Sequence, residues 1–200
     1  MSLRKSFRDD PGLSVLTYNT TGGETLLQRC AAHLGITVDV LGRSAREWSW
    51  EKKITLVHDY LDSAEPAEHV MCLDAFDTLI LDSPQVILER FQATSARILF
   101  GCTGTDWPPS AEHRRFEDDV YRGAPKAHRH LNASYIGKTA EVRRCVDRIS
   151  RAIAAGESWC RTGAGFDDQL AWREMHRSDH PHLKIDVNCS IFARFDEDRW

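Results

Sequence analysis

Two aspartates three positions apart follow an apolar run near the middle of the chain. The run 70–73 leads directly into Asp74, and Asp77 follows. If the run is a strand and the chain turns after it, this spacing lets both carboxylates face one point, where they repel unless a cation lies between them. Oxygen ligands suit Mg²⁺ or Mn²⁺, and such an ion also neutralises charge on a departing diphosphate. The segment therefore predicts a divalent metal site for a diphosphate substrate.

The same segment allows two other interpretations. Aspartate is common in turns, so Asp74 could cap the turn while Asp77 is solvated. The segment also resembles the signature of the haloacid-dehalogenase phosphatases, in which a nucleophilic aspartate is followed two residues later by a second one. Here the spacing is three, and the motif follows the third predicted strand instead of opening the chain.

Length and composition limit the class of protein. The chain has 200 residues, enough for one α/β domain, and 42% of them are hydrophobic, which excludes a disordered chain. The formal net charge of −4 gives no preference for nucleic acid. No signal peptide and no apolar stretch long enough to span a membrane is present in the sequence, so we expect a cytoplasmic protein. The 6 cysteines form no C-x-x-C pair, and we expect reduced thiols, with Cys72 and Cys145 buried.

The elements that must position the aspartates alternate along the chain. This alternation predicts an α/β fold, with a mainly parallel sheet and helices on both faces, and ligands then bind beyond the carboxyl ends of the strands. We expect a long polar loop over 103–130. The expected strands are 13–18, 36–41, 70–73, 97–100, 135–137, 183–187 and 190–192. The expected helices are 24–34, 51–61, one that begins at 83–84, one that begins at 139 and ends at 156, and 166–175.

An ordered set of short segments resembles a known family. Between about 16 and 192, the chain is similar to the N-terminal glycosyltransferase domain of the procollagen lysyl hydroxylases (procollagen galactosyltransferase/glucosyltransferase) and its microbial and viral relatives. No single segment is specific, but their order is. The segments are Val15-Leu16-Thr17-Tyr18, Val38-Asp39-Val40-Leu41-Gly42, Glu47-Trp48, Lys53, Asp74-Ala75-Phe76-Asp77, Trp107-Pro108, Leu131-Asn132, Ile136-Gly137, Asp167-Asp168-Gln169-Leu170 and Ile191-Phe192.

The resemblance implies a GT-A-type nucleotide-diphospho-sugar transferase fold, a UDP-sugar donor and Mn²⁺ (or Mg²⁺). By resemblance, Asp74 and Asp77 hold the metal on the UDP diphosphate. Phe76 would lie against the uracil ring, which has an apolar face to bury. Thr17 and Trp48 match positions of the nucleotide site. Without the resemblance, Phe76 fits ordinary core packing equally well.

Five further residues acquire expected roles in the same way. Lys53 would meet a phosphate, Trp107 would shape the sugar pocket, and Asn132, Asp167 and Asp168 would face the donor sugar and the acceptor hydroxyl. A carboxylate there could act as a base or stabilise positive charge at the anomeric carbon. On the residues alone, Lys53 fits a solvated helix face, and Trp107 fits either a lid over a ligand or a loop anchor in the core. The two aspartates fit the acidic first turn of a helix.

Four features differ from the family pattern. The glycine-rich stretch between Trp48 and Lys53 is missing, Leu56 replaces a tryptophan, and the segment 132–135 is one residue shorter than its Asn-Ser-Gly-Gly counterpart. The family's third metal ligand is a histidine downstream of the last strands, and the chain ends before any such segment. Three options stay open: the chain lacks that segment, His180 or His182 substitutes, or two acids, diphosphate and water hold the metal.

The hypothesis that follows is a single GT-A-like glycosyltransferase domain over 13–200, after a flexible N-terminus at 1–12, with the option that its C-terminal segment is absent. It would move a hexose from a UDP-sugar to a hydroxyl acceptor. The alternative is a non-catalytic relative that binds UDP or serves a structural purpose. The sequence leaves the sugar, the acceptor, the stereochemical outcome and the oligomeric state open.

Overall fold

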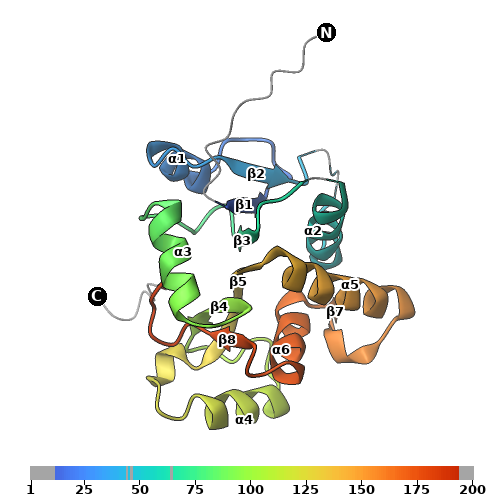
Figure 1. Ribbon diagram of the computed structural model, residues 1–200. Coiled ribbons are helices and arrows are strands. Elements are labelled where there is room, and N and C mark those ends of the chain that lie inside the picture. The colour runs from blue at the N-terminus through green and yellow to red at the C-terminus, as the bar shows by residue number, and fades with distance from the viewer. Residues whose placement is uncertain (1–11, 44, 46, 64, 194–200) are drawn as a thin grey trace.

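A mixed six-stranded sheet forms the centre of the molecule. The computed structural model describes residues 12–43, 45, 47–63 and 65–193. The strand order is β2-β1-β3-β5-β4-β8, in which β5 is antiparallel to both neighbours and the other pairs are parallel (Figure 1). The strands are β1 (Leu13–Tyr18), β2 (Val38–Leu41), β3 (His69–Leu73), β4 (Ile98–Thr103), β5 (His130–Lys138) and β8 (Leu183–Ile185).

Helices cover both faces of this sheet, as the sequence predicts. α1 (Leu26–His33) and α3 (Pro84–Ala93) lie on one face, and α2 (Trp50–Ser63), α5 (Thr139–Ala155) and α6 (Asp168–Ser178) lie on the other (Figure 1). Every residue of β1, β3 and β4 is buried, which explains their nearly continuous apolar sequences. The remaining elements are α4 (Ala111–Val120), the short 3₁₀ helices η1 (Lys126–His128) and η2 (Ser158–Cys160), and a small ladder of β6 (Arg161–Thr162) and β7 (Gly165–Phe166).

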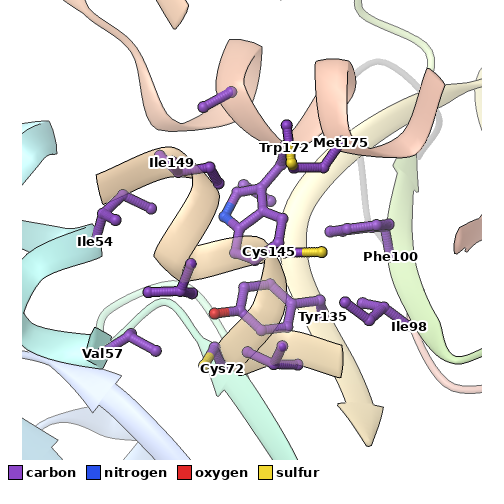
Figure 2. Close-up of a cluster of buried hydrophobic side chains, with 14 of the residues drawn as sticks. Ile54, Val57, Cys72, Ile98, Phe100, Tyr135, Cys145, Ile149, Trp172 and Met175 are labelled. Carbon is purple, nitrogen blue, oxygen red and sulfur yellow. The ribbon is translucent and has the colours of Figure 1, made fainter. Parts of the chain in front are cut away.

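The larger core lies between the sheet and α2, α5 and α6. Trp172 packs at its centre, with its ring centroid 4.6 Å from that of Tyr135 and 5.5 Å from that of Phe100 (Figure 2). Cys72 and Cys145 are buried in the same cluster, as expected. This packing fixes α6 against the sheet, and the N-terminal end of α6 carries two of the predicted site residues, Asp167 and Asp168.

Local sequence signals determine where several helices begin and end. Ser83 caps α3 and accepts a hydrogen bond from the amide of Val86, with Pro84 in the first turn. Thr25 and Gln28 form a reciprocal capping box at α1. Gly156 ends α5 in the left-handed conformation, with φ of 67°.

Three expectations about the elements are wrong. The segment 103–130 is not one long loop, because α4 and η1 lie within it. The buried residues of α4 are His113 and Glu117, so its inward face is polar and gives no apolar period. Residues 190–192 do not form a strand, because their amides donate to the carboxylate of Asp186. β5 is also longer than predicted and antiparallel.

Two expectations concern the chain ends and membranes. The flexible N-terminus predicted for 1–12 falls outside the described residues, except for Gly12. Among the helices that the structure describes, none combines the length and the apolar character required to cross a bilayer.

Candidate functional site

An open cleft of about 1200 Å³ lies at the carboxyl ends of β3 and β4. Residues from both strands and from the antiparallel strand β5 between them line it, as does the segment after β8. This position agrees with the expectation that ligands bind beyond the strand ends. The lining includes Asp74, Asp77, Gly101, Asn132, Cys189 and Phe192.

The two predicted metal ligands line the same cleft. Asp74 follows the last residue of β3, and its side chain is 47% exposed. Asp77 lies in the turn beyond and is exposed. Thr17 supports this strand end from β1, because its hydroxyl donates a 2.8 Å hydrogen bond to the carbonyl of Leu73. Thr17 is completely buried, so it positions the strand end and does not line the cleft.

A buried lysine joins Asp74 to a second carboxylate. Nζ of Lys53, on α2, lies 3.1 Å from Oδ1 of Asp74 and 3.1 Å from Oδ2 of Asp168. The side chain of Lys53 is only 8% exposed, so it is not on a solvated helix face. Burial alone would lower the pKa of Lys53, but the charges of Asp168 and Asp74 raise it above its usual value. Lys53 is therefore a permanent cation within the site.

Asp168 is a buried carboxylate that pairs with Lys53. It is 5% exposed, and the geometry of its contact with Lys53 is that of an ion pair without a hydrogen bond, which leaves Oδ2 with no hydrogen-bond partner in the described part of the chain. Asp168 does lie in the acidic first turn of α6, as the residues alone indicate, but it is buried there and paired with Lys53. Asp167 does have a local role, because its side chain caps α6 by accepting a 2.9 Å hydrogen bond from the amide of Leu170. Burial raises the pKa of Asp167.

Aromatic side chains surround Lys53. Its Nζ lies 5.1 Å from the ring centroid of Tyr18 and 6.0 Å from that of Trp50, close enough for cation–π contacts. Trp48 lies edge-on to both rings, at 6.2 and 6.1 Å, and is 42% exposed. In this group (Tyr18, Trp48 and Trp50) the two tryptophans are exposed and Tyr18 is buried, and none of the three lines the cleft.

Phe76 and Trp107 are both exposed aromatic residues. Phe76 is 62% exposed and Trp107 is 57% exposed, so neither is a core residue, contrary to the core-packing alternatives that the sequence left open. The carbonyl of Trp107 accepts a 2.7 Å hydrogen bond from Gln169, which attaches its loop to α6. Trp107 is not among the residues that line the cleft.

A bulge brings Asn132 to the cleft. The ladder between β4 and β5 shifts register, so that Tyr135 pairs with Phe100 while Asn132 pairs with Gly101. Asn132 Oδ1 accepts a 3.0 Å hydrogen bond from the amide of Ser134 within the inserted residues. Bulges of this kind redirect side chains next to functional sites. Here Asn132 and Ser134 both line the cleft.

The structure restricts the third metal ligand. His180 and His182 precede β8, which runs parallel to β4, whereas Asp74 follows β3. The two histidines therefore lie near the amino ends of the parallel strands, whereas the cleft lies at the carboxyl ends. Neither histidine can replace the family's third metal ligand. Within the described residues, no group of three candidate ligand side chains includes Asp74 or Asp77. For a metal at this site, the described residues therefore offer the carboxylates of Asp74 and Asp77.

Nothing in the sequence indicated that three cleft-side residues come together. Cys102 and Cys189 line the cleft, and His128 contacts Cys189. Cys189 lies 87 positions from Cys102 and 61 from His128, so no local spacing links them. The only available signal was their residue types, because cysteine and histidine are both metal ligands.

Comparison with known proteins identifies the family. A family model described as "PLOD GT domain" matches residues 10–198. Procollagen-lysine,2-oxoglutarate 5-dioxygenase 2 of Homo sapiens is 24% identical over 199 residues, which cover 90% of this chain and 24% of the human protein. The protein of the same name from Mus musculus is 24% identical over 181 residues, covering 81% of this chain and 22% of the mouse protein. The chain thus spans about a quarter of the length of these relatives. Since the family match covers nearly the whole chain and the helix-flanked mixed sheet is consistent with a GT-A-like fold, the chain belongs to the PLOD GT domain family of glycosyltransferases.

Proposed function

We propose that this chain transfers a hexose from a UDP-sugar to a hydroxyl acceptor, with Mn²⁺ or Mg²⁺ held by Asp74 and Asp77. One observation carries the proposal: in a member of this family, the two carboxylates follow the third strand and line one open cleft. Family membership removes the support for the phosphatase alternative. The cytoplasmic location expected from the sequence stays a prediction.

The donor set fits a hard divalent ion. Asp74 and Asp77 offer carboxylate oxygens at the cleft, and diphosphate oxygens and water would complete the coordination. When bound, the ion supplies positive charge that stabilises departing UDP. Lys53 donates a 3.1 Å hydrogen bond to Oδ1 of Asp74 and so orients that carboxylate. In this proposal Lys53 acts through Asp74 and does not contact a phosphate itself.

The exposed aromatic residues suit the uracil base. Phe76 lies between the two aspartates in sequence, and an exposed ring at that position can bury the apolar face of a base. Trp48 presents further exposed apolar surface within the aromatic group of Tyr18, Trp48 and Trp50. Most of the binding energy would then come from the nucleotide.

The sugar side of the proposal rests on Asn132. It is the one residue of the predicted set of Asn132, Asp167 and Asp168 that lines the cleft. Its amide nitrogen is the donor left after Oδ1 accepts from Ser134, and a donor suits sugar hydroxyls. Asp168 is a positioning residue in this account, because it acts through Lys53. A catalytic role for Asp167 or Asp168 stays a prediction.

Calorimetry with UDP tests the nucleotide and metal parts together. We expect UDP to bind in the presence of Mn²⁺ and to bind weakly in its absence. Asp77→Asn should reduce the Mn²⁺-dependent affinity for UDP by more than about tenfold. Replacing a residue that only hydrogen-bonds to a metal ligand already lowers metal affinity about 10–100-fold. Asp82→Asn is the matched control, since it removes the same charge from the same cleft outside the motif. No UDP binding with or without Mn²⁺ would end the proposal.

A non-catalytic relative is the second candidate. It is favoured by the absence of a third ligand among the residues that the structure describes and by the ion pair of Asp74 with Lys53. UDP release from UDP-hexoses separates the two candidates. Slow, Mn²⁺-dependent release that Asp77→Asn abolishes supports the transferase. UDP binding without any release supports the non-catalytic relative.

A further inference from the structure

Three side chains from separate segments converge at the wall of the cleft. Cys102 lies on β4, His128 ends η1, and Cys189 lies in the segment after β8. The two Sγ atoms are 3.6 Å apart, and Sγ of Cys189 is 3.7 Å from both ring nitrogens of His128. One ligand atom from each residue lies within 4.8 Å of the other two.

Two of the three separations match a tetrahedral zinc site, and the third, between Cys102 and His128, is within 4.8 Å. Zinc binds thiolate sulfur at about 2.3 Å and imidazole nitrogen at about 2.0–2.1 Å. Tetrahedral angles then separate two sulfur ligands by about 3.8 Å and a sulfur from a nitrogen by about 3.6 Å. The observed separations of 3.6 and 3.7 Å lie close to both values. Both cysteines are free thiols, and a disulfide would require the sulfurs to approach to about 2.05 Å.

The hydrogen bond of His128 leaves one ring nitrogen available to a metal. Its Nδ1 lies 3.0 Å from the carbonyl oxygen of Val187. A carbonyl only accepts, so Nδ1 carries the proton and Nε2 keeps its lone pair. Histidines that bind metals commonly donate their other N–H to a backbone carbonyl in this way. Nε2 is also the nitrogen whose metal bond would leave this hydrogen bond intact.

The segment that carries Cys189 is held rigidly by a buried aspartate. The carboxylate of Asp186 accepts hydrogen bonds from the hydroxyl and amide of Ser190 and from the amides of Ile191 and Phe192. Asp186 itself is 4% exposed, and its amide donates to the carbonyl of Phe100. Cys189 has a φ of 50°, a conformation uncommon for residues other than glycine. Such conformations persist where the surroundings impose them, and they cluster at ligand sites.

We propose that Cys102, His128 and Cys189 bind a zinc ion on the wall of the cleft, with its fourth position taken by water or by a ligand in the cleft. Three protein ligands and one open position are typical of zinc sites that are not purely structural. Both cysteines line the cleft, so the ion can be reached from it. The site is separate from the pair Asp74 and Asp77, whose oxygen ligands suit a harder ion than thiolates do.

Zinc would also link the wall of the cleft together. The ion would connect β4, η1 and the segment after β8, which are otherwise joined here by hydrogen bonds and packing. Binding displaces one proton from each thiol to solvent, because thiolates are the ligands. Zinc affinity should therefore fall as the pH falls.

Metal titration of the full chain tests this inference. Reduced, metal-free protein is titrated with Zn²⁺ alone, and a parallel sample is titrated with Co²⁺, whose thiolate charge-transfer absorption reports sulfur ligands. We expect one Zn²⁺ per chain and a tetrahedral Co²⁺ spectrum. Cys189→Ser and His128→Ala should each weaken Zn²⁺ binding at least about tenfold, since even outer-shell changes cost about 10–100-fold. Cys30→Ser is the matched control, because Cys30 is another partly exposed free thiol and is not in the cluster.

The outcomes are separable from those of the proposed function. A variant carrying both Asp74→Asn and Asp77→Asn should keep the Zn²⁺ site, whatever becomes of UDP binding. Zn²⁺ uptake below one per chain, or uptake that Cys189→Ser and His128→Ala leave unchanged, overturns the inference. So does a Co²⁺ spectrum without thiolate absorption. If Cys189→Ser does not fold, His128→Ala decides, because His128 is the last residue of the short helix η1 and is only partly buried.

Discussion

Replacing Lys53 by methionine tests whether this lysine is the cation that holds the site together. Lys53 is 6% exposed and joins Asp74 to Asp168, which is 5% exposed. The substitution keeps the apolar stem but leaves a buried carboxylate without its cation. Breaking a buried pair in this way costs about 3–5 kcal/mol. For a chain of this length, that corresponds to a fall in melting temperature of about 6–20 °C.

The assay is urea unfolding of four proteins: the parent chain, Lys53→Met, Asp168→Asn and the double variant. We expect the single variants to lose more in sum than the double variant does, with a coupling energy of about 1–3 kcal/mol. Lys52→Met is the matched control, because Lys52 lies at the exposed start of α2 and should change stability by less than about 0.5 kcal/mol. Equal stabilities of Lys53→Met and Lys52→Met, or additive effects in the cycle, would refute the role given to Lys53.

Three further predictions concern the base, the sheet and pH. Phe76→Ala should weaken UDP binding by about 1–3 kcal/mol in calorimetry, as for stacked bases, without changing stability. Leu81→Ala, which truncates another exposed side chain after β3, should change neither UDP binding nor stability. Gly137→Ala should lower the free energy of unfolding by about 1–3 kcal/mol, because its new methyl would lie 2.9 Å from two side chains, whereas Gly163→Ala meets nothing within 4 Å and should not. Burial lowers the pKa of His176 to about 3, so the folded state excludes a proton that the unfolded state binds below about 6.5, and stability falls as the pH drops through that range. At pH 5, His176 alone should lower the free energy of unfolding by about 2 kcal/mol relative to pH 7.5. His176→Gln should remove that part of the pH dependence in urea unfolding, and an unchanged pH dependence would contradict the lowered pKa of His176.

The sequence was most informative where local chemistry determines local structure. The run before Asp74 is apolar because β3 is buried along its whole length, so the sequence could identify this strand. Ser83 and Gly156 marked helix ends because their capping interactions are local. α4 could not be predicted from apolar spacing, because Glu117 faces inward and is held there by Arg173, with Nη2 and Oε2 2.7 Å apart. That partner lies 56 positions away.

The parts of the site that sequence could not supply depend on distant partners. Lys53 was expected at a phosphate or in solvent, and its burial follows from Asp168 in α6, which no spacing along the chain reveals. The bulge that brings Asn132 to the cleft arises from the pairing of β5 with β4. The convergence of Cys102, His128 and Cys189 likewise requires the complete sheet. Pairings across the sheet, and not residue types, determine these features.

In the proposed function, Asp74 and Asp77 together bind one divalent ion on the diphosphate of UDP. Crystals grown with UDP and Mn²⁺, measured at the manganese absorption edge, test it directly through the anomalous difference map. We expect one manganese peak in the cleft, about 2.1 Å from carboxylate oxygens of both aspartates and bound to the diphosphate. A peak that contacts neither aspartate, or UDP bound elsewhere on the molecule, would contradict it.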